Sequence, residues 1–233
     1  MIEKHLSSQF DAELNAVSTR IMAMGGLVEA QIANAVNALS TFDLDKAQQV
    51  IHEDKQVNQM EMAIDHDLTN VIARRQPTAR DLRLLIAISK TTTNLERVGD
   101  EAVKIARMVK SIIDLGGSKN LPTSDLTVSA QLASRLIQKA LNALARLDVD
   151  AALDILREDD QIDMEFDGFV RKLVTYMMED PRTISESLDL LFVAKALERI
   201  GDHAKNIAEF VVYIVKGEDI RHISLDQLNS VMK

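Results

Sequence analysis

The sequence contains no cysteine and no tryptophan, and aromatic residues make up only 3% of its 233 residues. The lack of cysteine excludes disulfide bonds and thiolate metal ligands. Few aromatic rings are available to stack on the bases of a single-stranded nucleic acid. The formal net charge of −9 also disfavours binding to a phosphate backbone. We therefore expect no nucleic acid partner.

Long apolar runs are missing as well, since no stretch approaches the roughly eighteen apolar residues of a membrane-spanning helix. The N-terminal stretch MIEKHLSSQFDAE lacks the apolar centre of a signal peptide. These absences predict a cytoplasmic protein. Glycine and proline number only 8 and 3, which favours long helices with few turns.

Two stretches of the sequence occur twice. LERVGDEAVKIA, which begins at Leu95, recurs as LERIGDHAKNIA from Leu197, with eight of twelve positions identical and an offset of 102. The 23-residue stretches that begin at Val36 and Leu141 share nine identities at an offset of 105. Two matches in the same order at nearly the same offset indicate that one unit has been duplicated.

A stretch rich in helix breakers separates the two copies. DLGGSKNLPTSD, at residues 114–125, contains two glycines and one proline among polar residues. We therefore place a first domain at 1–115 and a second at 122–217, with a C-terminal tail at 218–233.

Apolar residues recur every three or four positions through both copies, which is typical of amphipathic helices. The pattern of the first copy breaks at residues 41–45 and again at Pro77, and the second copy has helix starts near Thr123, near Asp150 and after Pro181. Long helices joined by short connections pack antiparallel to their neighbours. The predicted fold is therefore all-α, a tandem repeat of two antiparallel three-helix bundles.

Each copy carries a glutamate and an aspartate four residues apart. At 100° per residue, Glu96 and Asp100 share a helix face away from the apolar seam, as do Glu198 and Asp202. Like charges at this spacing repel each other, and a bound cation would offset the repulsion. Carboxylate oxygens suit Mg²⁺, Mn²⁺ or iron. His203 falls on another face and is not an expected ligand, and a plain solvated face is the competing interpretation.

The preceding helix of each copy adds further oxygen ligands. Asp159 and Asp163 are four residues apart in the second copy, and Asp54 and Asn58 take the same places in the first. If the helices are neighbours, these side chains converge with the acidic pairs. The glycine inside each pair predicts close helix packing, with clearance for a bound ion as the alternative. The candidate metal ligands are Asp54, Glu96, Asp100, Asp159, Asp163, Glu198 and Asp202.

The sequence shows no catalytic constellation. A ferritin-like oxidase needs inward-facing acids and Glu-x-x-His motifs, and no histidine here follows a glutamate by three residues. A glycine-rich phosphate loop and a Ser/His pairing are not visible either. We therefore expect no enzyme. A metal-free helical scaffold remains the alternative, and the arginines around Pro77 either meet an acidic partner or favour helix ends: Arg74, Arg75, Arg80 and Arg83.

Several stretches occur in a specific combination: MGGLVEAQI, ARRQPTARDLR, YMMEDPRTI and the two LER[VI]GD copies. Together they resemble the PhoU family of bacterial phosphate-specific transport accessory proteins over about residues 2–223. The resemblance implies the same pair of three-helix bundles, a homodimer, no enzymatic activity and a location peripheral to the inner membrane.

The resemblance also implies a function. Such proteins act as negative regulators of the phosphate-starvation response and link the ATPase of the phosphate ABC transporter to a membrane sensor histidine kinase. Some members carry metal clusters through E/D-x-x-x-D motifs, so magnesium, manganese, iron or zinc ions are the implied cofactors. Asn58 departs from the acid of that pattern. We therefore expect the site of the first copy to be weaker or empty.

Overall fold

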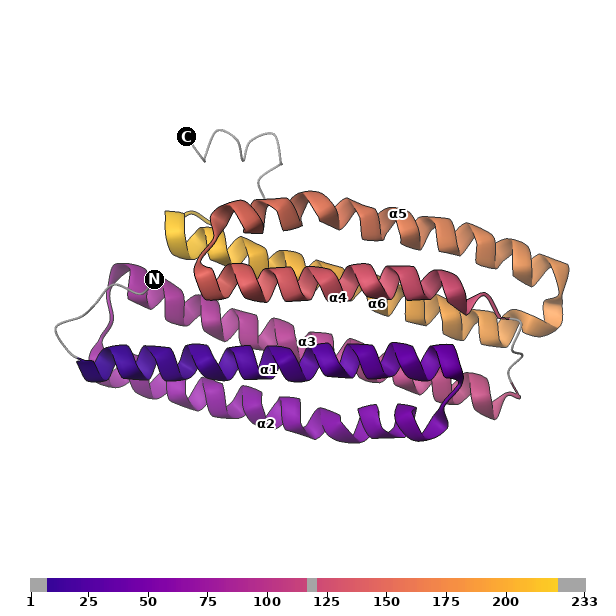
Figure 1. Cartoon of the computed structure of the whole chain (residues 1–233), viewed down its shortest axis with the longest axis horizontal. Coiled ribbons are helices and arrows are strands. Elements are labelled where there is room, and N and C mark those ends of the chain that lie inside the picture. The colour runs from indigo at the N-terminus through magenta and orange to yellow at the C-terminus, as the bar shows by residue number, and fades with distance from the viewer. Residues whose placement is uncertain (1–7, 117–120, 222–233) are drawn as a thin grey trace.

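The structure is a computed structural model that describes residues 8–116 and 121–221. Within these ranges the chain forms six long α-helices and no strand, which confirms the predicted all-α fold (Figure 1). One 3₁₀ turn, Pro181–Thr183, precedes the last helix. The helices are α1 (Ser8–Thr41), α2 (Leu44–Arg75), α3 (Ala79–Asp114), α4 (Thr123–Arg146), α5 (Val149–Glu179) and α6 (Ile184–Lys216).

The α1–α2 and α4–α5 connections are built alike. Asp43 and Asp148 cap the N-termini of α2 and α5, and each side chain accepts a hydrogen bond from a backbone N–H three residues later. The residue before each cap, Phe42 or Leu147, adopts a left-handed conformation with φ of 51° or 53°. These pairs are equivalent at the offset of 105, so the duplication preserves the turn as well as the helices.

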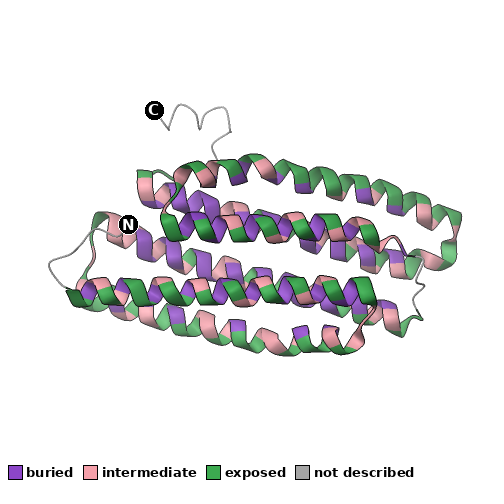
Figure 2. Cartoon of the chain, viewed as in Figure 1, coloured by how far each residue is buried: buried purple, intermediate pink, exposed green. Residues whose placement is uncertain are grey.

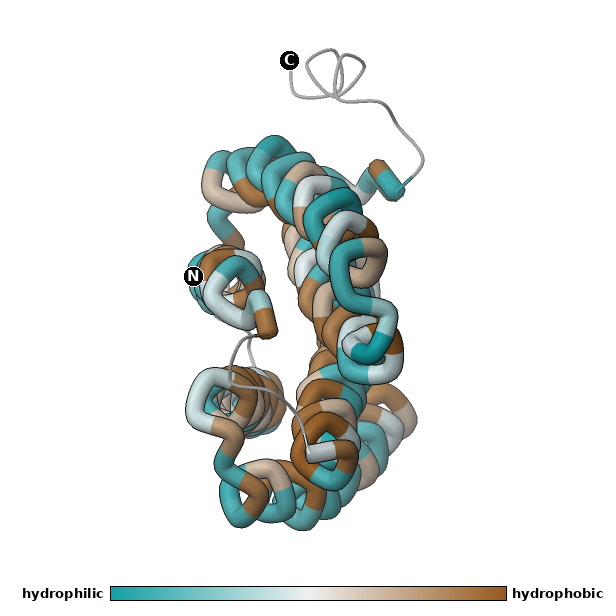
Figure 3. Tube along the Cα trace, turned by 90° about the vertical axis from the view of Figure 1, so that its right-hand side faces the viewer, coloured by the Kyte–Doolittle hydropathy of each residue, from teal (hydrophilic) through white to brown (hydrophobic). Residues whose placement is uncertain are grey.

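Each half forms a three-helix bundle, and the two bundles pack against each other (Figure 1). Contacts of α3 with α6 and of α1 with α4 join them, and the end-on view of Figure 3 places α5 and α2 at opposite ends of an elongated section. The buried apolar residues of both halves form one continuous cluster. Separate folding of 1–115 and 122–217 stays a prediction, and most of the expected tail, 222–233, lies outside the described residues.

Burial is shared unevenly among the helices. Sixteen residues are buried on α3 and sixteen on α6, but only six on α2 and seven on α5. Figure 2 shows the outer helices α2 and α5 as largely exposed or intermediate. The reason is that α3 and α6 pack on helices of both bundles, whereas α2 and α5 pack mainly within their own. Each outer helix therefore packs one side on its own bundle and exposes much of the rest to solvent.

Candidate metal centres and the groove between the bundles

The first acidic cluster lies between α2 and α3. Asp54 of α2 and Glu96 of α3 are half-buried, whereas Asp100 of α3 is exposed. Burial and the charge of Asp100 raise the pKa of Glu96, and burial and the charge of Asp54 raise the pKa of Asp100. Glu61 of α2 joins them, because burial and the charges of Asp65 and Asp100 raise its pKa. The structure therefore places the three expected acids near enough to interact electrostatically, with Glu61 as a fourth carboxylate.

The second acidic cluster lies between α5 and α6. Asp163 and Asp202 are exposed and Glu198 is half-buried. Burial, followed by the charges of Glu198 and Asp159, raises the pKa of Asp202 to about 6. Burial and the charge of Asp159 also raise the pKa of Asp163. Asp159 is nearly buried, at 5% exposure, which is tolerated because Lys205 pairs with its carboxylate.

Two lysines neutralise part of the second cluster. Lys205 Nζ donates a hydrogen bond to Asp159 Oδ2 over 2.8 Å. Lys195 Nζ donates one to Glu198 Oε1 over 2.6 Å. Each ammonium group therefore supplies positive charge at short range to an acid that the sequence marked as a metal ligand.

The first cluster has no such lysines. The residues that correspond to Lys195 and Lys205 at the offset of 102 are Thr93 and Val103. In the described part of the chain, no lysine or arginine forms an ion pair with any of the four acids of this cluster. The duplication has thus kept the acids in both bundles, but lysines hydrogen-bonded to these acids are found only in the second.

Gln31 of α1 lies behind the first cluster. Its side chain is completely buried, and neither amide atom has a hydrogen-bond partner. Asp54 Oδ1 and Asn58 Oδ1 are also buried without a partner. A Cβ on Gly99 would lie 3.2 Å from Gln31 Oε1 and 3.6 Å from Asp54 Oδ1, so both oxygens flank the same point on α3.

The second bundle packs more tightly at the equivalent glycine. A Cβ on Gly201 would lie 2.7 Å from Ile162 Cδ1 and 3.6 Å from Asp159 Oδ1. The position of Gln31 is taken there by the buried Leu136. Close helix packing, which the sequence favoured, is therefore found at this glycine, whereas Gly99 borders unpartnered polar atoms.

A metal role for the seven candidate acids stays a prediction. In the described ranges, no three Asp, Glu or His side chains converge closely enough to hold an ion by themselves. The first cluster still fits a cation, because buried oxygens of Gln31, Asp54 and Asn58 are without partners beside its carboxylates. The second cluster fits one less well, because Lys195 and Lys205 already occupy two of its acids.

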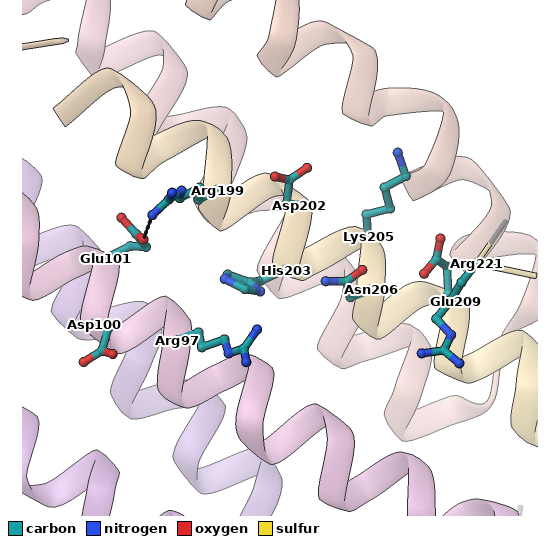
Figure 4. Close-up of a pocket in the computed structure, with 10 residues that line it drawn as sticks. All are labelled: Arg97, Asp100, Glu101, Arg199, Asp202, His203, Lys205, Asn206, Glu209 and Arg221. Carbon is teal, nitrogen blue, oxygen red and sulfur yellow. Dashed lines mark hydrogen bonds and ion pairs between the residues drawn. The ribbon is translucent and has the colours of Figure 1, made fainter. Parts of the chain in front are cut away.

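A groove of about 620 Å³ crosses the junction of α3 and α6 and is lined by side chains of both charges (Figure 4). Arg199 of α6 donates a hydrogen bond to Glu101 of α3 over 3.0 Å. His203 Nδ1 lies 2.9 Å from Asn94 Oδ1 of α3, so the ring binds the other bundle. Burial and the charge of Arg97 lower the pKa of His203. This orientation agrees with the prediction that His203 lies on a different face from the acids.

The arginines around Pro77 are partly engaged within the fold. Arg75, in the last turn of α2, donates two hydrogen bonds to Glu13 of α1, at 2.8 and 2.7 Å. The guanidinium of Arg83 packs against Gly217, which ends α6. Arg75 therefore acts at a helix end and between helices, where a cation interacts favourably with the helix dipole.

Sequence reasoning missed four side chains that shape the clusters, although each leaves a trace. A glutamine interrupts the apolar seam of α1, and a glutamate follows Asp54 by seven residues, or two helical turns. A lysine stands three residues outside each end of the second acidic pair. These side chains are Gln31, Glu61, Lys195 and Lys205.

These features define a class: a duplicated, all-α protein that carries clusters of ionisable side chains on its two central helices. Among the described helices, none combines the length and apolarity required to cross a membrane. The chain belongs to the PhoU family, whose PhoU domain matches residues 21–109 and 127–211. The family resemblance that the motifs indicated is therefore confirmed.

Individual relatives match over nearly their whole length. The phosphate-specific transport system accessory protein PhoU of Escherichia coli (strain K12) is 46% identical over 235 residues, 99% of this chain and 95% of the relative. The crystal structure of PhoU from Pseudomonas aeruginosa gives a TM-score of 0.86 at 47% identity, covering 90% of this chain and 100% of that one. The phosphate transport system regulatory protein PhoU from Streptococcus pneumoniae gives 0.82 at 29% identity, covering 90% and 98%.

Proposed function

We propose that this chain is an accessory protein of a bacterial phosphate transport system and a negative regulator of the phosphate-starvation response. The observation that carries the proposal is the 46% identity, over 99% of the chain, to a protein named as the phosphate-specific transport system accessory protein. Its partners are the ATPase of the phosphate ABC transporter and the cytoplasmic part of a sensor histidine kinase. It acts as a homodimer without catalysis, in the cytoplasm and peripheral to the inner membrane.

The exposed apolar side chains beside the α5–α6 connection support a role in protein contacts. Ile184, Leu188 and Phe192 follow one another at intervals of four on α6, with 42%, 44% and 49% of each exposed. Val174 and Met178 of α5 are 47% and 78% exposed. We call these five residues the hairpin patch. Apolar groups gathered on a surface in this way are typical of a protein interface.

Metal ions form a second part of the proposal. Divalent or iron ions would bind oxygen ligands on the acidic faces. There they would offset the burial and the mutual repulsion that raise the pKa of Glu96, Asp100 and Asp202. A metal-free scaffold is the alternative, and it requires that protein purified without a chelator retains no metal.

Deletion of the gene tests the regulatory role. In cells grown with abundant phosphate, the deletion is expected to switch on a reporter driven by a phosphate-starvation promoter, and a plasmid copy of the gene should switch it off again. Unchanged reporter expression in the deletion strain would refute the regulatory role. Co-purification of the full chain with the cytoplasmic part of the kinase, and separately with the transporter ATPase, tests the two partners.

A further inference from the structure

The duplication provides an internal comparison between two versions of one acidic cluster. At the offsets of 102 and 105, both bundles place an aspartate of the outer helix beside a Glu-x-x-x-Asp pair of the central helix. Their surroundings differ in three ways. The pairs of equivalent residues, with the first bundle named first, are Gln31 and Leu136, Asn58 and Asp163, and Val103 and Lys205.

The first cluster has weaker charge neutralisation than the second, and several of its buried polar atoms have no hydrogen-bond partner. No described lysine or arginine pairs with its acids, which lie on α2 and α3. Arg97 and Arg107 act on Glu96 and Asp100 without forming ion pairs with them. Asn58 Nδ2 donates a hydrogen bond to Asp54 Oδ2 over 3.2 Å, and Asp54 Oδ1 remains unpartnered.

The Gln31 amide is fully buried with both polar atoms unpartnered, as is Asp54 Oδ1. Buried polar groups in native proteins nearly always have a partner. The oxygens Gln31 Oε1 and Asp54 Oδ1 flank the place that a Cβ on Gly99 would take, at 3.2 and 3.6 Å from it, so one cation between them would satisfy both.

The second cluster already contains positively charged groups beside its acids. The ammonium of Lys205 lies 2.8 Å from Asp159 Oδ2, and the ammonium of Lys195 lies 2.6 Å from Glu198 Oε1. An apolar residue, Leu136, replaces the buried amide behind it. One buried oxygen of this cluster, Glu198 Oε2, has no partner, but a divalent cation there would compete with the ammonium groups of Lys195 and Lys205 for the same carboxylates.

We infer that only the first bundle takes up a hard divalent cation, with the amide oxygen of Gln31 as a ligand beside Asp54, and that Lys205 replaces the cation in the second bundle. The inference rests on the metal-binding part of the proposed function and narrows it to one of the two clusters. It also reverses the expectation that Asn58 weakens the first cluster, because amide oxygens are good ligands for hard cations.

Equivalent residues can be exchanged to test this. The full chain is first stripped of metal with a chelator and then titrated with Mn²⁺. Calorimetry and the electron paramagnetic resonance signal of free Mn²⁺ both measure how much Mn²⁺ the protein binds. Asp54→Asn is expected to abolish uptake, and the matched Asp159→Asn is expected to leave it unchanged. Gln31→Leu, which installs the residue of the second bundle, should weaken binding about tenfold or more.

The lysine can be exchanged in both directions. Lys205→Val should create a second set of Mn²⁺ sites in the second bundle, whereas Val103→Lys should suppress uptake by the first. Because Val103 is only 4% exposed, circular dichroism must confirm the helical content of that variant. Lys205→Val removes the ammonium partner of the nearly buried Asp159 carboxylate, so the helical content of this variant is confirmed in the same way.

The outcomes separate the inference from the proposal on which it rests. Equal loss of Mn²⁺ uptake in Asp54→Asn and Asp159→Asn, or an unchanged affinity in Gln31→Leu, overturns the inference and leaves metal binding intact. No Mn²⁺ uptake by the unsubstituted chain overturns the inference together with the metal part of the proposed function. The promoter reporter tests the regulatory part independently of either result.

Discussion

Arg199 and Glu101 form an ion pair that connects the central helices of the two bundles, with 3.0 Å between guanidinium and carboxylate (Figure 4). At the offset of 102, the mirror-related positions hold Arg97 and His203. His203 binds Asn94 instead, at 2.9 Å between Nδ1 and Oδ1. The junction between the bundles is therefore joined by different pairs on its two sides, although the helices that carry them are copies.

Arg199→Ala should destabilise the protein more than Glu101→Gln. Glu101 is only 8% exposed, and without Arg199 its carboxylate retains a single cationic partner, Lys104 at 3.4 Å. Leaving a nearly buried charge poorly paired costs about 1–2 kcal/mol of unfolding free energy, whereas Glu101→Gln leaves an uncharged amide in its place. Urea unfolding of both variants measures the difference. Equal stability of the two variants would contradict the extra cost of leaving the Glu101 carboxylate poorly paired.

Adjacent glycines of α1 should respond in opposite directions to alanine. Nothing lies within 4 Å of a Cβ on the exposed Gly26, so Gly26→Ala should stabilise the helix by about 0.5–1 kcal/mol. A Cβ on the buried Gly25 would lie 2.4 Å from Leu141 Cδ1 of α4. Overpacking of this kind outweighs the helix gain, so Gly25→Ala should destabilise by about 1–2 kcal/mol. Thermal unfolding of the two variants checks the sign, and stabilisation by both would contradict the close α1–α4 packing.

Asp202 should make the protein less stable as the pH rises from 4 to 6. Its pKa is about 6 in the folded chain, above the ordinary 3.8, so in this window the unfolded chain has released a proton that the folded chain retains. Asp202→Asn removes this dependence. The variant should be more stable than the parent at pH 7, by at most about 1 kcal/mol because water screens this exposed carboxyl.

Denaturant unfolding at pH 4, 5, 6 and 7 in the presence of a chelator measures this difference. Other carboxyls contribute to both profiles, so the informative quantity is variant minus parent at each pH. A difference that stays constant from pH 4 to pH 7 would contradict the raised pKa of Asp202.

Substitutions in the hairpin patch should weaken partner binding but leave the free energy of unfolding nearly unchanged. Leu188→Lys places a charge on an exposed apolar position and is expected to weaken binding to at least one proposed partner about tenfold or more. Its free energy of unfolding should change by less than about 0.5 kcal/mol. Met62→Lys is the matched control, because Met62 is 65% exposed on α2, away from the patch. Equal binding by both variants would exclude the patch as an interface.

Much of the fold follows from local signals. Apolar spacing predicted every helix, Asp43 and Asp148 mark two helix starts through their capping bonds, and Pro77 lies between α2 and α3. The 100° rotation per residue also placed Glu96 and Asp100 on one face of α3. Local signals suffice here because helix formation and helix faces depend on residues within a few positions of each other.

The contents of each cluster could not be predicted in the same way. Gln31 reaches the first cluster from α1, a helix that the acidic motifs do not include, and its unpartnered amide becomes apparent only when three helices meet. The engagement of Asp159 by Lys205 likewise depends on how α5 and α6 are rotated and shifted against each other. Periodicity shows which residues share a face of a helix. It does not show which of them lie opposite a given residue of the neighbouring helix, because that depends on the axial shift between the two helices.

By itself, the sequence determined the duplication, the six helices and the Glu/Asp pairs that lie on a helix face away from the apolar seam, since these depend on spacing along the chain. Only the tertiary structure decided which acids are neutralised. Lys205 pairs with Asp159 because packing brings their helices together, while the first bundle presents the apolar Val103 at the same place. Two nearly identical motifs therefore differ in charge balance, because each is completed by side chains from neighbouring positions and helices that the motif does not contain.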